Sequence, residues 1–190
     1  SSDSNTITDN TANSNTVYGI HVGTNSDNNI IDSFTTDDGA YILGENTTIN
    51  GTFSSAVGIE VATAGLNLSL YGPSTFSGDG ILISADNVTI DMAGYNMTGD
   101  GGDLDYAIDI STIAYNGTTV YNGGMYTFGY GVRSIGYNGN YTNLTINAGN
   151  GGEGVTYYGI HLTGDNHYVM DNYIFEKGDI LFGSIRPYLH

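Results

Sequence analysis

The side chains in this sequence that could perform acid–base chemistry are few and far apart. Asp109, Arg133 and His161 occupy the same position in a recurring short phrase, with spacings of 24 and 28 residues. Polysaccharide lyases use calcium-binding carboxylates with an Arg or Lys base, and glycoside hydrolases use paired carboxylates. If the phrases stack, these residues form one acid–base cluster. The alternative is an exposed ladder pair in which Arg133 only neutralises Asp109.

Three neighbouring aspartates suggest a second kind of chemistry. Asp100, Asp103 and Asp105 lie in a glycine-rich loop and could supply oxygen ligands to Ca²⁺, the one cofactor that the sequence suggests. Their spacing matches neither an EF-hand nor the glycine-rich nonapeptide of calcium-binding β-rolls. A solvated acidic turn is therefore the alternative.

Eight Asn-x-Ser/Thr sequons offer sites for N-linked glycans. In four of them the Asn opens a second recurring phrase and is expected to bond along an internal ladder, which would exclude a glycan: Asn46, Asn67, Asn87 and Asn143. The other four are the predicted glycosylation sites: Asn50, Asn96, Asn116 and Asn140.

Tyrosine dominates the aromatic residues, with 16 copies and no Trp. Several copies crowd the Gly- and Asn-rich segment 115–141. Exposed tyrosines in such a segment suit protein contacts or stacking on sugars, whereas packing in the core is the alternative. The predicted binding residues are Tyr121, Tyr126, Tyr130 and Tyr137.

The recurring phrase that contains Asp109, Arg133 and His161 reads Gly, apolar, variable, apolar. We call it the first phrase. Its clear copies begin at Gly19, Gly58, Gly80 and Gly159, and looser copies begin at Gly39, Ala107 and Gly131. The second phrase reads Asn, apolar or Thr, Thr or Ser, apolar, as in Asn87-Val88-Thr89-Ile90. Both phrases alternate apolar and polar residues with period two, which predicts short strands with one buried face.

Strands this short cannot bury a face alone, but coils stacked about 4.8 Å apart pair each strand with its equivalents above and below. The sequence therefore predicts an all-β fold, a right-handed parallel β-helix of about seven to eight coils over residues 1–176. The Gly that opens the first strand suits a corner with positive φ or close backbone approach. One outward column then reads His21, Tyr41, Glu60, Leu82, Asp109, Arg133 and His161, and another reads Thr48, Ser69, Thr89, Thr119 and Thr145.

At these phrases the chain resembles the right-handed parallel β-helix superfamily, in particular extracellular repeat proteins that include many from archaeal surfaces. The resemblance covers residues 17–175 and implies the fold, while the superfamily includes polysaccharide lyases and hydrolases, phage tailspikes, adhesins and envelope proteins. Residues 177–190 do not follow the repeat and are expected to form a C-terminal cap or docking segment. They also resemble a short string in specificity subunits of type I restriction systems, with chance similarity or an artificial junction as the alternatives.

The composition narrows the classes of function. With 20 acidic and 3 basic residues the formal net charge is -17, which argues against nucleic acid and anionic membranes as partners. There is no Cys, and no apolar run approaches the ~18 residues of a membrane span. The chain starts at Ser1 without an apolar signal segment, as expected of a processed mature chain or an excised domain.

We therefore expect a secreted or cell-surface protein with a structural or adhesive function, without catalysis and without membrane insertion. Its expected partners are copies of itself or other surface proteins, with which it forms an envelope layer, sheath or filament. The alternative is a carbohydrate-active enzyme, either a polysaccharide lyase or a hydrolase, or a glycan-binding module on the same fold. Glycans are candidate partners in both cases.

Overall fold

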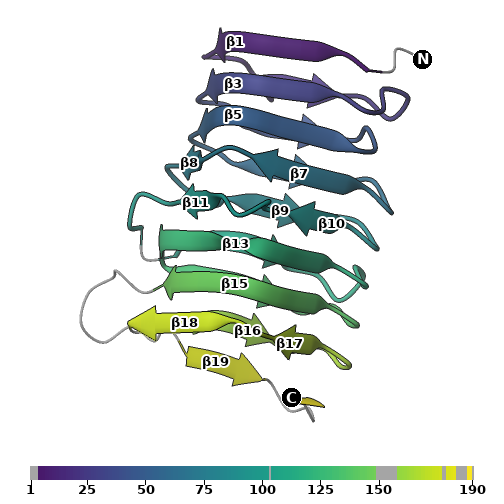
Figure 1. The fold of residues 1–190 in the computed structure, drawn as a ribbon. Coiled ribbons are helices and arrows are strands. Elements are labelled where there is room, and N and C mark those ends of the chain that lie inside the picture. The colour runs from purple at the N-terminus through teal and green to yellow at the C-terminus, as the bar shows by residue number, and fades with distance from the viewer. Residues whose placement is uncertain (1–3, 103, 149–157, 177–178, 183–187, 190) are drawn as a thin grey trace.

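The computed structural model describes residues 4–102, 104–148, 158–176, 179–182 and 188–189. Every regular element in these residues is a β-strand, and the strands stack in parallel from the N-terminal to the C-terminal end of a solenoid (Figure 1). This confirms the all-β parallel β-helix that the repeats predict. In the described part of the chain, no helix is long and apolar enough to cross a membrane.

The narrower of two sheets is built from the first phrase. Its eight strands stack in the order β2 (Ile20–Val22), β4 (Ala40–Ile42), β6 (Ile59–Val61), β9 (Ile81–Ile83), β12 (Tyr106–Ile110), β14 (Tyr130–Ser134), β16 (Tyr158–Leu162) and β19 (Asp179–Phe182). The solenoid has about six turns rather than the expected seven to eight. The difference arises because the expectation counted copies of the phrase, and the seven strands from β2 to β16 enclose six turns.

Within the described residues, the wider sheet has 12 strands. Its main path runs β1 (Thr6–Ala12), β3 (Ile30–Thr36), β5 (Thr47–Ser55), β7 (Asn67–Tyr71), β10 (Thr89–Asp91), β13 (Thr119–Phe128), β15 (Asn140–Ala148), β17 (Tyr168–Met170) and β20 (Tyr188–Leu189). The short strands β8 (Ser74–Phe76), β11 (Asn96–Thr98) and β18 (Tyr173–Glu176) pair with the second halves of the long strands. From the segment 177–190, β19 pairs with β16 and β20 pairs with β17.

The register of the narrower sheet is the predicted one. The outward residues of the first phrase stand side by side in successive turns from His21 to His161, and inward residues such as Ile81 are fully buried. The corner role of the opening glycines is also confirmed. Gly39 and Gly58 have φ values of 77° and 104°, and a Cβ on either would collide with the backbone of the next turn.

The register of the second phrase differs from the prediction at the copy that begins at Asn87. Thr89 pairs with Asn67 and not with Ser69, so the column moves by two residues between β7 and β10. A shift of two residues leaves every side chain on its own face of the strand. The alternation of apolar and polar residues therefore could not reveal it.

Thr145 does not belong to the predicted outward column, because the long strand β15 bends after its first three residues. Asn140 takes the place beside Thr119, and Thr145 lies beyond the bend. The bends in β15 and β13 fall at Asn143 and Asn122, with φ values of 53° and 60°. Asn adopts this left-handed backbone more readily than most residues with a Cβ.

Stacked side chains fill the interior. The rings of Phe34, Phe53, Phe76 and Phe128 form a column, with neighbouring ring centres 6.1 to 6.3 Å apart. Phe53 at the middle of this column has no exposed surface. Burial of a Phe side chain contributes about 1.5–3 kcal/mol, so the column is a main source of stability.

A histidine is enclosed near the C-terminal turns. His167 is 8% exposed, and its Nδ1 accepts a hydrogen bond from the N–H of Gly139 at 3.1 Å. Burial lowers the pKa of His167, against the opposing effects of the Gly136 carbonyl and of Asp165. The imidazole is therefore neutral in the folded protein at pH 7.

Replacement of Phe53 by Ala should lower the free energy of unfolding by about 3–5 kcal/mol, because it opens a cavity in the middle of the Phe column. Urea denaturation measures the change. The matched control is Ser54→Ala, an outward position on the same strand, which should change the free energy by less than about 0.5 kcal/mol. Equal losses for the two variants would contradict this account of the core.

The stability should also depend on pH through His167. A His in the unfolded chain titrates near about pH 6.5, whereas the folded chain holds His167 neutral to lower pH. The unfolded state then binds more protons, so stability is full above about pH 6.5 and falls as the pH drops below it. Urea midpoints at pH 7.5 and 5.5 measure the fall.

The variant His167→Asn keeps an acceptor for Gly139 but cannot be protonated, so it should reduce the fall in stability. A remainder is expected from His161, whose pKa is also lowered. His21→Asn at an exposed position serves as the control. An undiminished fall in His167→Asn would show that His167 does not carry the effect.

Candidate functional site

The narrower sheet brings the predicted acid–base residues together. Asp109 on β12 stands beside Arg133 on β14, which stands beside His161 on β16. The guanidinium of Arg133 holds the carboxylate with two hydrogen bonds, from Nε to Oδ1 at 2.7 Å and from Nη2 to Oδ2 at 2.6 Å. The sequence left open an exposed ladder pair at this position. The pair is instead partly enclosed, because Asp109 is only 6% exposed.

Aromatic rings surround this ion pair. Nη1 of Arg133 donates to the hydroxyl of Tyr106 at 3.1 Å, and Cζ lies 4.0 Å from the centre of that ring. Tyr106 stacks on Tyr130 at 4.8 Å, and Tyr130 lies 6.3 Å from Tyr158. Since both oxygens of Asp109 are bonded and its charge is balanced, the carboxylate is poorly placed for general acid or base catalysis.

His161 does not complete a catalytic pair. Burial, and then the charge of Arg133, lowers the pKa of its imidazole. The ring lies 5.1 Å from that of Tyr158, and within the described residues no hydrogen bond joins it to Asp109. The neighbours of His161 in the stack therefore include Arg133 and the ring of Tyr158.

The acidic loop is described only in part. Asp100 accepts a hydrogen bond from the N–H of Gly102 at 2.9 Å. Burial is the main cause that raises the pKa of Asp105, and the negative charges of Asp79 and Asp100 raise it further. Asp103 lies outside the described residues, as does any calcium site that needs it. Among the residues that the structure does describe, no group of three or more His, Asp or Glu side chains could hold a metal ion.

The asparagines that open the second phrase are exposed, so the premise of an internal Asn ladder is wrong. Asn46, Asn87 and Asn143 lie at turns or bends of the chain, where their backbone is left-handed. Hydrogen bonds along the stack do occur at the surface, as from Asn67 Nδ2 to Asn46 Oδ1 at 3.1 Å. Burial therefore does not separate these four sequons from the others.

The four predicted glycosylation sites differ in exposure. Asn50 and Asn96 are exposed, whereas Asn116 and Asn140 are half-buried. The side chain of Asn116 is also held locally, because Nδ2 donates to the carbonyl of Ala114 at 3.3 Å and Oδ1 accepts from the N–H of Tyr137 at 2.9 Å. Asn50 and Asn96 are the more accessible of the four.

The predicted binding tyrosines do not share one surface. Tyr130 belongs to the aromatic stack on the narrower sheet. Tyr137 lies outside this stack and is 39% exposed. Tyr121 lies on the wider sheet beside Asp91, and partial burial, followed by the charge of that carboxylate, raises its pKa. Tyr126 is the one of the four that lines a groove on the wider sheet.

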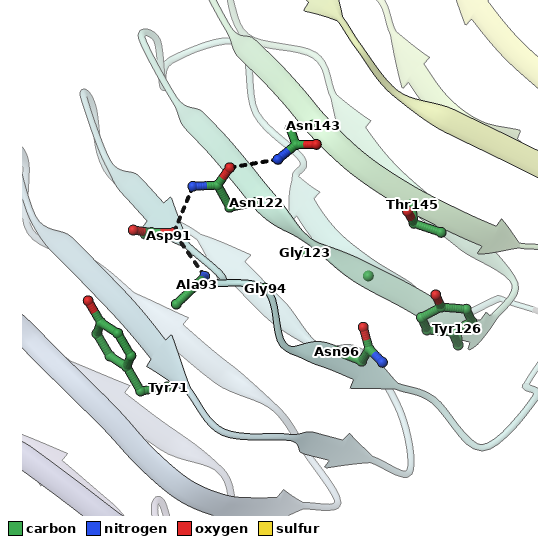
Figure 2. A pocket seen from close by; sticks show the side chains of 11 residues that line it. Tyr71, Asp91, Ala93, Gly94, Asn96, Asn122, Gly123, Tyr126, Asn143 and Thr145 are labelled. Atoms are coloured by element: carbon green, nitrogen blue, oxygen red, sulfur yellow. Dashed lines mark hydrogen bonds between the residues drawn. The ribbon is translucent and has the colours of Figure 1, made fainter.

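This groove has a volume of about 550 Å³ and crosses the bend of the wider sheet. Figure 2 shows Tyr71 and Tyr126 at opposite sides of it, with Asn96 near Tyr126 and with Asn122 and Asn143 along one rim. The residues come from five strands or their ends and from the loop between β10 and β11. No single stretch of sequence forms the groove.

Glycines make room for the groove. A Cβ on Gly124 would collide with Oδ1 of Asn96 and with the ring of Tyr126, so this ring lies directly against the glycine. On the inward side of the strand, a Cβ on Gly123 would collide with the buried Met92 of the preceding turn, so Gly123 allows the close packing beneath the groove. The floor between the two tyrosines is therefore formed largely by backbone.

One rim of the groove is a ladder of polar side chains. Nδ2 of Asn143 donates to Oδ1 of Asn122 at 2.8 Å, and Nδ2 of Asn122 lies 3.5 Å from Oδ1 of Asp91 (Figure 2). The same carboxylate oxygen accepts from the N–H of Ala93 at 2.9 Å. These bonds hold donors and acceptors of three successive turns at a regular spacing.

Sequence reasoning found only part of this site. It singled out Tyr126 as a binding residue and Asn96 as a glycosylation site, but it did not select Tyr71 or Asn122. The signal that could have found the groove is Gly123-Gly124 within a long strand, since glycine inside a strand marks a bulge or a close approach of another chain segment.

Replacement of Arg133 by Ala should lower the free energy of unfolding by about 1–3 kcal/mol, because it leaves the buried carboxylate of Asp109 without its partner. Urea denaturation at pH 7 measures this change. Asp109→Ala and the double variant complete the cycle, in which the double variant should lose less than the sum of the two single losses. Strictly additive losses would show that the pair does not act as a unit.

Comparisons with known protein families, curated proteins and solved structures find no match for this chain. Its function is therefore inferred from the ion pair, the groove and the charge of the chain itself.

Proposed function

We propose that the chain is a structural or adhesive element of an extracellular surface and not a carbohydrate-active enzyme. The observation that carries this proposal is the closed ion pair of Asp109 and Arg133. These residues belong to the one acid–base cluster that the repeat suggests, and here they are bonded to each other and packed against Tyr106. They join neighbouring turns, and Arg133 occupies both carboxylate oxygens of Asp109, which leaves that carboxylate poorly suited to catalysis.

The composition of the outer faces supports the same proposal. Charged residues make up only 12% of the chain, and the formal net charge is -17. A neutral-polar surface with an acidic excess suits contacts with glycans, cations and other proteins better than contacts with nucleic acid or anionic membranes. We therefore place the protein outside the cell or on its surface.

Assembly with copies of the chain is the structural part of the proposal. In the described residues β1 pairs with β3 along one edge, and most of its side chains are exposed. An open strand edge pairs readily with a further strand, which a second copy could supply. The acidic charge opposes this contact, so association should strengthen as salt screens the repulsion.

The purified chain should cleave none of a broad panel of neutral and acidic polysaccharides, and the variant Asp109→Asn should likewise show no cleavage. It should form larger particles at about 0.5 M salt than at low salt, because added ions shorten the range of the repulsion. Reducing-end assays measure cleavage, and light scattering with electron microscopy measures assembly. Cleavage that Asp109→Asn abolishes would overturn the structural proposal in favour of an enzyme.

A further inference from the structure

We propose that the groove between Tyr71 and Tyr126 is a binding site for a neutral oligosaccharide. This inference rests on the proposed adhesive function and names the class of ligand through which adhesion would act. It assigns the contact to the bend of the wider sheet and not to the aromatic stack around Arg133.

The two tyrosines provide fixed platforms at the sides of the groove. The ring of Tyr126 lies against Gly124 and meets the ring of Phe175 edge-on at 6.5 Å, so its position is set before any ligand arrives. Tyr71 is 48% exposed and offers its ring to solvent. Sugar rings carry C–H faces that pack on aromatic rings, so each tyrosine can receive one unit of a sugar chain.

The rim between the tyrosines matches the hydroxyl groups of a sugar. A hydroxyl both donates and accepts, and the amides of Asn96, Asn122 and Asn143 present both kinds of atom. The hydrogen bonds of the rim hold Asn122 and Asn143 in place. Little side-chain freedom is therefore lost when a ligand binds.

The charge of the lining decides between classes of ligand. None of the eleven residues that line the groove is basic, and Asp91 is the one acidic residue among them. Phosphorylated, sulfated and uronic acid ligands would meet this carboxylate without a compensating cation. An apolar peptide would find amides, hydroxyls and backbone in place of an apolar floor. A neutral sugar chain has neither difficulty.

The size and shape of the groove define the ligand further. A volume of about 550 Å³ falls within the range of about 300–1,000 Å³ that is usual for small-molecule sites. Because the groove is open along the sheet, it suits an internal stretch of a longer chain better than an enclosed monosaccharide. Binding should strengthen from monosaccharide to oligosaccharide.

The groove also contains two sequons, at Asn96 and Asn143. A glycan attached to Asn96 would occupy the space between the tyrosines and compete with a free ligand. Protein made in a host without N-glycosylation should therefore bind free oligosaccharides. Protein whose Asn96 carries a glycan should bind them at least about tenfold more weakly.

The test uses unglycosylated full-length chain on an array of neutral oligosaccharides, with gluco-, manno-, galacto- and N-acetylglucosamine series, and of sulfated and uronic acid oligosaccharides. Titration calorimetry then follows the best binder. Tyr71→Ala and Tyr126→Ala should each weaken binding at least about tenfold. Tyr137→Ala, which removes an exposed tyrosine outside the groove, is the matched control and should bind as the wild type does.

A variant that fills the groove keeps the test independent of folding. Thr145 is a half-buried outward residue that lines the groove, and Thr145→Arg places a long side chain in it without touching the core. The variant should keep the far-UV circular dichroism and the urea midpoint of the wild type and lose neutral-sugar binding. If it instead binds sulfated or uronic acid ligands, the charge argument is supported as well.

Two results would overturn the inference. The first is a lack of binding to every neutral series, and the second is neutral-sugar binding that Tyr126→Ala and Thr145→Arg leave unchanged. If the chain still assembles or adheres in either case, the groove inference fails while the proposed function stands. If the chain cleaves polysaccharides through Asp109, the proposed function fails, whatever the groove binds.

Discussion

The parallel pairing of each turn with the next is the constraint on which the rest of this structure depends. Because the strands pair in parallel, a residue in one turn lies close to its equivalents in the turns before and after it. Each side chain in such a column must therefore pack against, or bond to, its neighbours in the turns before and after it. The interior meets this demand with apolar residues such as those of the Phe column, and the surface meets it with pairs that attract or stack.

The surface columns show three solutions to the same demand. Asp109 and Arg133 balance their charges across two turns, Tyr106 and Tyr130 stack, and the asparagines of the bend bond to one another. The first two solutions close the surface, because each side chain is satisfied by its neighbour. The third leaves amide atoms beside a floor of glycine, and it therefore creates a place where a ligand can be held.

The sequence predicted seven of the eight described strands of the narrower sheet, all but β19, and it predicted the wider sheet in part, for physical reasons. Most copies of the first phrase open with a glycine that a corner requires, so they can be aligned residue by residue, as the pairing of Tyr41 with Glu60 confirms. The second phrase contains only alternation, which a shift of two residues preserves. The misplacement of Thr89 follows from that degeneracy, whereas Thr145 was misplaced because β15 bends at Asn143. The exposure of Asn46 and Asn87 was missed because Asn is equally suited to a buried ladder and to a left-handed turn.

The groove was harder to predict than the ion pair because it depends on what its columns lack. An ion pair is visible as two complementary residues at equivalent positions, whereas the groove arises where Gly124 stands in place of the larger Thr145 of the next turn. Glycine within a strand lowers stability, since it adds conformational entropy to the unfolded chain and packs no side chain. Two consecutive glycines in the longest strand of the solenoid therefore oppose stability locally. Gly124 leaves room for Tyr126 and Asn96, and Gly123 leaves room for the buried Met92, and these contacts offset the cost.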